Sequence, residues 1–194
     1  MNQLSLRQRE IIDSALEIIA EKGIDNFTIK NLARARGISE PALYRHFESK
    51  QNILILIITR YRNSILDLFD QLIEDEMPAY RKIESFYMEM LRRFSDKPSL
   101  STILFSDELF RHSKPLSKEV NSIIDMIHAR IETILKNVKS RKELKTDVPC
   151  SDLAWIIMGT MRITVTRWIL SGYSYDPVPD GKKMLKSMKK LIFI

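Results

Sequence analysis

Cysteine, glycine and long apolar runs are all scarce in this chain of 194 residues. Its single cysteine, Cys150, excludes an internal disulfide framework, and the absence of a Cys/His cluster leaves a structural zinc site without ligands. Five glycines and seven prolines are too few for the turns of an all-β or Gly-looped α/β fold. The longest purely apolar run covers residues 53–58, whereas a membrane-spanning helix needs about 20 apolar residues. We therefore expect a helical, cytoplasmic protein with no metal, cofactor or membrane partner.

The composition is that of a folded and moderately basic protein. Hydrophobic residues make up 44% and charged residues 29%, which argues against intrinsic disorder. The net charge is +6 and the isoelectric point is near 9.4. So mild an excess is as common on an ordinary solvated surface as on one that binds nucleic acid. The distribution of the charges along the chain has to decide between the two.

Apolar residues recur at helical spacing nearly everywhere, and caps and prolines divide the pattern into about nine segments. Ser5 and Gln8 form a capping-box pair that predicts a helix over about residues 6–22. Gly23 is expected to end this helix, because glycine readily adopts the left-handed conformation that commonly follows a helix. Three more helices follow, each with a cap residue at its start. The first is expected to run from Thr28 to Gly37, the next from Ser39 to Phe47, and the third from Ser49 to Glu74.

Prolines mark the helix starts in the second part of the chain, because the first turn of a helix tolerates a missing amide. Ser151 is expected to cap a further helix that ends at Gly172, after a polar loop at residues 140–149, and a last helix starts near Asp180. We predict an all-α protein with a three-helix domain over residues 1–50 and a larger helical domain over residues 51–194. The prolines that open the intervening helices are Pro78, Pro98 and Pro115.

The second and third segments have the spacing of a helix-turn-helix. The small Ala33 lets the following helix cross closely, and Gly37 supplies the positive φ of the short turn. Ile38 and Leu43 bury the second helix against the first. An ordinary helical hairpin with a glycine C-cap has the same spacing, so the pattern leaves this alternative open.

The outer face of residues 39–46 is left free for a DNA major groove. From Asn26 to Lys50 there are five Lys/Arg and two acids, a local excess of three positive charges. This clustering favours a nucleic-acid surface over a merely solvated one. The flanking cations are Lys30, Arg34, Arg36 and Lys50.

The run from Thr28 to Ala33, together with Gly37-Ile38-Ser39 and the segment from Leu43 to Lys50, resembles the DNA-binding domain of TetR-type transcriptional regulators. The resemblance covers about residues 9–54, and the helical remainder is similar in pattern only. It implies a homodimer that binds a palindromic operator, usually as a repressor, and is released by a small molecule. The segment from Ser39 to Phe47 is also similar to a branch that includes a nucleoid-occlusion factor, which binds DNA to regulate division. We keep both possibilities.

Carried over by position, the resemblance assigns DNA contacts to the second and third helices and to the start of the fourth. Thr28, Lys30 and Lys50 would contact phosphates. Glu40-Pro41 departs from the common family form, because a carboxylate there repels phosphate although it can accept from a cytosine amino group. The residues that would face the groove are Ser39, Glu40, Pro41, Ala42, Tyr44, Arg45 and His46.

The larger domain offers candidates for a hydrophobic ligand pocket but no catalytic set, so an enzyme is the weaker alternative. Glu108 and His112 stand four residues apart and would share a helix face, as metal ligands or, as we prefer, as a surface ion pair. Each aromatic or methionine candidate is also an ordinary core residue. The expected pocket consists of Phe86, Tyr87, Met90, Phe105, Glu108, His112, Trp155 and Arg162.

The helix that begins near Ser151 has no charge from Leu153 to Met161, and Gly159 within it indicates the close approach of another helix. It is either a central core helix or a dimer contact, and the TetR resemblance favours the dimer. The basic face of the last helix is assigned to solvent, because its apolar stripe is needed for packing. The expected dimer residues are Gly159, Ile163, Leu185 and Met188.

Overall fold

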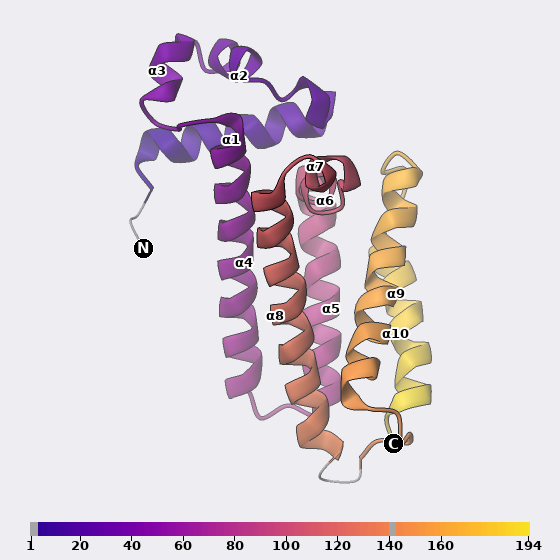
Figure 1. Cartoon of the computed structure of the whole chain (residues 1–194). Coiled ribbons are helices and arrows are strands. Elements are labelled where there is room, and N and C mark those ends of the chain that lie inside the picture. The colour runs from indigo at the N-terminus through magenta and orange to yellow at the C-terminus, as the bar shows by residue number, and fades with distance from the viewer. Residues whose placement is uncertain (1–3, 140–142) are drawn as a thin grey trace. The chain divides into compact units, whose positions relative to one another are not determined.

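The structure, a computed structural model, describes residues 4–139 and 143–194. Regular structure in these residues is helical apart from one isolated β-bridge between Leu144 and Phe193 (Figure 1). The predicted all-α class is therefore confirmed. In chain order the helices are α1 (Leu6–Lys22), η1 (Ile24–Asn26, a 3₁₀ turn), α2 (Ile29–Ala35), α3 (Glu40–Tyr44), α4 (Lys50–Glu74), α5 (Ala79–Asp96), α6 (Pro98–Leu104), α7 (Asp107–Arg111), α8 (Lys114–Lys139), α9 (Cys150–Leu170) and α10 (Val178–Ile192).

The chain forms two compact units. Unit 1 comprises Met1–Tyr61 and Lys97–Val120, and unit 2 comprises Arg62–Asp96 and Asn121–Ile194. This division differs from the boundary expected at residue 50, because α6 packs against α1 and so belongs with the N-terminal helices. Helices α4 and α8 each contribute to both units.

Local sequence signals account for the helix ends in unit 1. The capping box of α1 is present: Ser5 Oγ accepts from Gln8 N, and Gln8 Oε1 accepts from Ser5 N. Gly23 follows α1 with φ 78°, a backbone conformation that favours glycine. The apolar stripe of α1 is buried, with Ile11 and Ile19 at most 1% exposed. These features confirm the predicted first helix.

Two local predictions in the second part of the chain need correction. Residues 98–112 form two short helices, α6 and α7, because the chain breaks near Phe105 and Ser106 Oγ then caps a new helix by accepting from Leu109 N. Helix α9 begins at Cys150, directly after Pro149, so Ser151 lies in its first turn and does not cap it. The expected loop at 140–149 lies partly outside the described residues.

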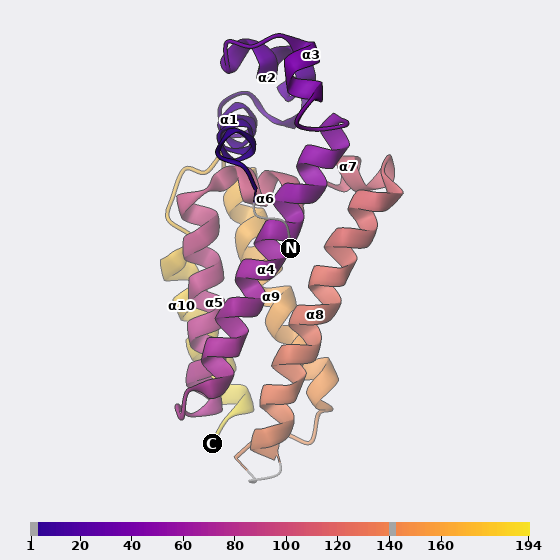
Figure 2. The same cartoon turned by 90° about the vertical axis from the view of Figure 1, so that its left-hand side faces the viewer.

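In unit 2, α5, α9 and α10 pack against one another (Figures 1 and 2). The rings of Phe69 and Phe86 stack with centroids 4.4 Å apart. A Cβ added at Gly181 would overlap Cδ1 of Leu91, so glycine lets α10 approach α5 closely. A Cβ at Gly159 would meet nothing within 4 Å. The close helix approach expected at Gly159 therefore occurs at Gly181 within the chain.

Candidate DNA-binding surface

The turn between α2 and α3 has the conformation that its residues predict. Gly37 has φ 61°, and Ile38 N donates to Ala33 O over 3.0 Å, which ends α2. Ala33 is 3% exposed and Leu43 is fully buried, whereas Ile38 is only half-buried. Packing thus holds α3 against α2 and leaves its outer face open (Figure 2).

Helix α3 is shorter than predicted. Ser39 Oγ caps it by accepting from Ala42 N over 3.3 Å, but the helix ends at Tyr44 and not at Phe47. The last turn tightens, because the amides of His46 and Phe47 both donate to Leu43 O. This geometry buries the Phe47 ring, so Arg45 and His46 are turn residues that follow the helix.

The residues assigned to DNA contact lie on the accessible side of α2, α3 and the turn that follows. Tyr44 is half exposed although it is aromatic, whereas Leu32 and Leu43 on the inner side are fully buried. The half-buried members are Thr28, Ala42, His46 and Lys50. The exposed members are Lys30, Ser39, Glu40, Pro41, Tyr44 and Arg45.

Lys50, the first residue of α4, has a defined setting. Its Nζ lies 5.3 Å from the centroid of the Phe27 ring, within range of a cation–π interaction. Burial lowers the pKa of Lys50, and the carboxylate of Asp25 partly opposes that change. A partly buried cation gains from an added phosphate neighbour, which suits the predicted role of Lys50.

Arg36 differs from the other flanking cations because its charge is paired with the carboxylate of Glu10. Its Nη2 binds Glu10 Oε2 at 2.5 Å, and Arg7 Nη1 binds the same oxygen at 3.0 Å. Lys30 and Arg34 are exposed. The Arg36 charge is thus offset within the chain, and sequence reasoning did not find this contact, because Glu10 and Arg36 are 26 positions apart.

The residues expected to line one ligand pocket are divided between the units. Phe86, Tyr87 and Met90 are at most 1% exposed in the core of unit 2. Trp155 and Arg162 lie on the exposed side of α9. The remaining three, Phe105, Glu108 and His112, belong to unit 1.

Glu108 and His112 do line a pocket, of about 380 Å³, together with Asp25, Lys50 and Gln51 of unit 1. They lie on α7 and at its C-cap, where His112 N donates to Glu108 O. Within the described residues no group of three His, Cys, Asp or Glu is placed to hold a metal ion.

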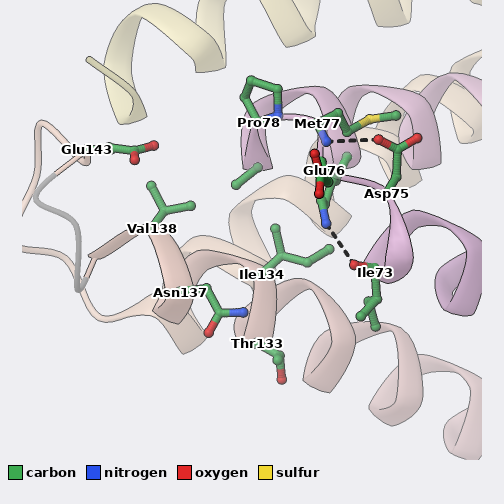
Figure 3. A pocket seen from close by; sticks show the side chains of 12 residues that line it. Ile73, Asp75, Glu76, Met77, Pro78, Thr133, Ile134, Asn137, Val138 and Glu143 are labelled. Atoms are coloured by element: carbon green, nitrogen blue, oxygen red, sulfur yellow. Dashed lines mark hydrogen bonds between the residues drawn. The ribbon is translucent and has the colours of Figure 1, made fainter.

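A second pocket, of about 370 Å³, lies in unit 2 between the α4–α5 connection and the end of α8 (Figure 3). Asp75, Glu76 and Glu143 give it three carboxylates. Lys82 contributes a cation, but its Nζ already donates to Ile73 O over 3.0 Å. The pocket is therefore unsuited to an anionic ligand.

The outer face of α9 carries exposed apolar side chains. Trp155, Ile156 and Ile163 are 47%, 50% and 52% exposed, and Gly159 lies between them. Trp155 and Ile156 precede Gly159 by four and three residues, and Ile163 follows it by four, so the four positions form one stripe along the helix. An apolar stripe of this kind indicates a surface that another molecule covers.

The dimer residues predicted on α10 need correction. Leu185 and Met188 are 2% and 6% exposed, because they pack inside unit 2, where Met188 Sδ accepts from Thr160 Oγ1. The accessible apolar side chains of α10 are Met184 and Leu191, 37% and 72% exposed. Gly159 and Ile163 lie on the exposed side of α9, as the prediction requires.

Among the described helices, α9 alone is long and apolar enough to cross a membrane by length and composition. The length of the longest uninterrupted apolar run did not predict this apolar character of α9. A buried helix of a soluble protein passes the same test, and 39% of the most apolar stretch of α9 is buried. The helix is therefore weak support for a membrane segment.

Two family models together match nearly the whole chain. Residues 11–57 match the model of bacterial regulatory proteins of the tetR family, and residues 59–193 match the C-terminal region of YsiA-like proteins. The chain belongs to the TetR family. It is accordingly a DNA-binding transcriptional regulator with an N-terminal helix-turn-helix.

Proteins similar to this TetR-family regulator include a nucleoid occlusion factor and two solved regulators of the FadR type. The nucleoid occlusion factor SlmA of Aliivibrio fischeri is 28% identical over 176 residues, which cover 90% of this chain and 89% of the relative. The fatty acid degradation regulator FadR from Bacillus halodurans has a TM-score of 0.83 at 20% identity, with 96% of both chains covered. FadR from Bacillus subtilis, solved in complex with stearoyl-CoA, has a TM-score of 0.79 at 24% identity and covers 95% of this chain and 97% of its own.

Proposed function

We propose that this TetR-family regulator is a cytoplasmic, ligand-responsive repressor that binds a palindromic operator as a homodimer. The observation that carries the proposal is the open face of α3, with Tyr44 half exposed beside Arg45 and with Lys50 at the start of the next helix. Leu43 anchors the opposite side in the core. Such a helix fits a major groove while neighbouring cations contact the phosphates.

The two kinds of DNA contact fall to different residues. Lys30 and Lys50 carry the phosphate contacts, and Thr28 adds a hydroxyl donor, because its oxygen accepts from Asn31 N and leaves the O–H free to donate. The side chains of α3 and the following turn read the bases. They are Ser39, Glu40, Pro41, Ala42, Tyr44, Arg45 and His46.

The exposed stripe of α9 supports the homodimer. Trp155, Ile156 and Ile163 would pack on the same residues of the partner subunit, around the open position of Gly159. Burial of such a face contributes about 25 cal/mol for each Å² of apolar surface, from which the entropy lost on association is subtracted. We therefore assign α9 to the twofold interface.

A hydrophobic inducer with an acceptor group suits the interior of unit 2. Tyr87 is fully buried, and burial raises the pKa of its hydroxyl, which stays a neutral donor with a long contact of 3.4 Å to Thr160. Trp168 Nε1 is buried without an acceptor in the described part of the chain. An acceptor on a ligand would satisfy the Trp168 donor. The stearoyl-CoA of Bacillus subtilis FadR, with its long apolar acyl chain, and the triclosan of a SmeT complex both combine an apolar part with acceptor groups.

Division control is the second candidate function. The observation in its favour is the 28% identity with SlmA across 90% of the chain. A regulator of that kind needs no inducer, so the two candidates differ in whether a small molecule changes the affinity for DNA.

Stearoyl-CoA, shorter acyl-CoA thioesters and triclosan are the probes that separate the candidates. We expect at least one of them to stabilise the fold by about 2.7 kcal/mol at 100 times its dissociation constant, and to release the operator in the same concentration range. Thermal shift and fluorescence anisotropy on a labelled operator measure both effects. Stabilisation without release, or no stabilisation by any probe, would contradict the sensor and favour division control.

A further inference from the structure

The capping residue Gln8 makes a second contact that its local role does not require. Its Oε1 accepts from Ser5 N over 3.0 Å, which completes the capping box of α1. Its Nε2 donates over 3.3 Å to the backbone carbonyl of His46, 38 residues further along the chain. One side-chain amide therefore joins the start of α1 to the turn that follows α3.

Chemistry fixes the orientation of this amide. The backbone amide of Ser5 can only donate and the carbonyl of His46 can only accept, so the oxygen of Gln8 must face Ser5 and its nitrogen must face His46. The carbonyls after a helix end have no partner within the helix. Gln8 supplies one to His46.

A second side chain of α1 contacts the end of α2, the helix that precedes α3. Glu10 Oε2 binds Arg36, which follows the last residue of α2 and precedes the turn at Gly37. Gln8 and Glu10 both precede the buried stripe of α1, which begins at Ile11. Helix α1 thus contacts the end of α2 and the turn that follows α3.

We propose that Gln8 is a positioning residue for DNA recognition, which fixes the angle of α3 by holding the carbonyl of His46. The inference rests on the proposed role of α3 in the major groove. Base contacts require side chains placed within a fraction of an ångström, whereas phosphate contacts by flexible lysines tolerate small rotations. Loss of the contact should therefore lower sequence discrimination more than general affinity for DNA.

Two substitutions of Gln8 separate its two contacts. Gln8→Glu retains the acceptor for Ser5 and the preferred capping-box residue, but it loses the donor to His46. Gln8→Lys retains a donor for the carbonyl and loses the acceptor. The readout is the ratio of affinities for operator and for scrambled duplexes of equal length. The effect of the added charge on affinity cancels in this ratio, because both duplexes carry the same number of phosphates.

We expect Gln8→Glu to lower the ratio by about tenfold, the scale of one hydrogen bond, and to lower the thermal midpoint no more than Ser5→Ala does. Gln8→Lys should keep the ratio of the wild type. Ser5→Ala is the matched control, because it removes the cap oxygen but leaves the contact with His46, so it should lower the midpoint and keep the ratio. A wild-type ratio in Gln8→Glu, or an equal loss in Gln8→Lys, would overturn the proposal. Absence of an operator for the wild-type chain would instead contradict the role of α3.

Discussion

Replacement of Gly159 by leucine should separate the protomers and weaken operator binding by about 10²–10⁴-fold, the advantage that linking two binding modules confers. Within the chain a Cβ at this position meets nothing within 4 Å, so the folded protomer accommodates the new side chain. Leucine also favours a helix more than glycine does, since glycine costs about 0.8–1.0 kcal/mol relative to alanine in a helix interior. If Gly159→Leu folds but loses operator binding, the cause therefore lies at the surface that the partner subunit covers.

Sedimentation at micromolar concentration measures the assembly, and circular dichroism checks the helix content. Asn121→Leu is the matched control, because it adds a similar side chain at an exposed position of α8 outside the stripe. The control should remain a dimer with unchanged operator affinity. A monomeric wild-type protein, or a dimer in Gly159→Leu, would contradict the assignment of α9.

Removal of the Lys50 charge should weaken binding to every DNA sequence to a similar extent. Lys50→Ala abolishes one phosphate contact in each protomer, so the slope of log affinity against log salt should fall by about 0.9 for each protomer bound. Near 0.1 M salt this corresponds to a loss of about eightfold for each contact. The discrimination between operator and scrambled DNA should stay close to that of the wild type.

Affinity measured across a salt series, on operator and on scrambled duplexes, gives both quantities. Lys190→Ala makes the same charge change on the exposed side of α10, and it should leave the slope unaltered. If Lys50→Ala had the wild-type slope, Lys50 would make no phosphate contact and the docking face would need revision.

The elements that were predicted correctly from the sequence are those whose signals lie within a few neighbouring residues. The capping box of Ser5 and Gln8 and the positive φ at Gly37 need only a few neighbouring residues, and both are present. Helix α7 was missed because its five residues are too few to carry a periodic pattern. Ser106 and the acids that follow it were the available signal, since a cap with acids in the first turn is typical of a helix start.

Contacts between distant segments could not be predicted from local patterns. Apolar residues cover a wide face of α10, and only the packing of α5 and α9 decides that Leu185 and Met188 are buried while Met184 and Leu191 stay accessible. The contact of Gln8 with His46 likewise joins positions 38 residues apart. Residue type alone cannot reveal either arrangement, because both depend on how helices meet.

Selection of binding sites from a pool of random duplexes tests the central claim most directly. Two α3 helices related by a twofold axis should enrich an inverted repeat whose half-site centres lie about 10–10.5 base pairs, or a multiple of that, apart. Enrichment of a single half-site or a direct repeat, or no enrichment at all, would contradict a twofold dimer that reads DNA through α3.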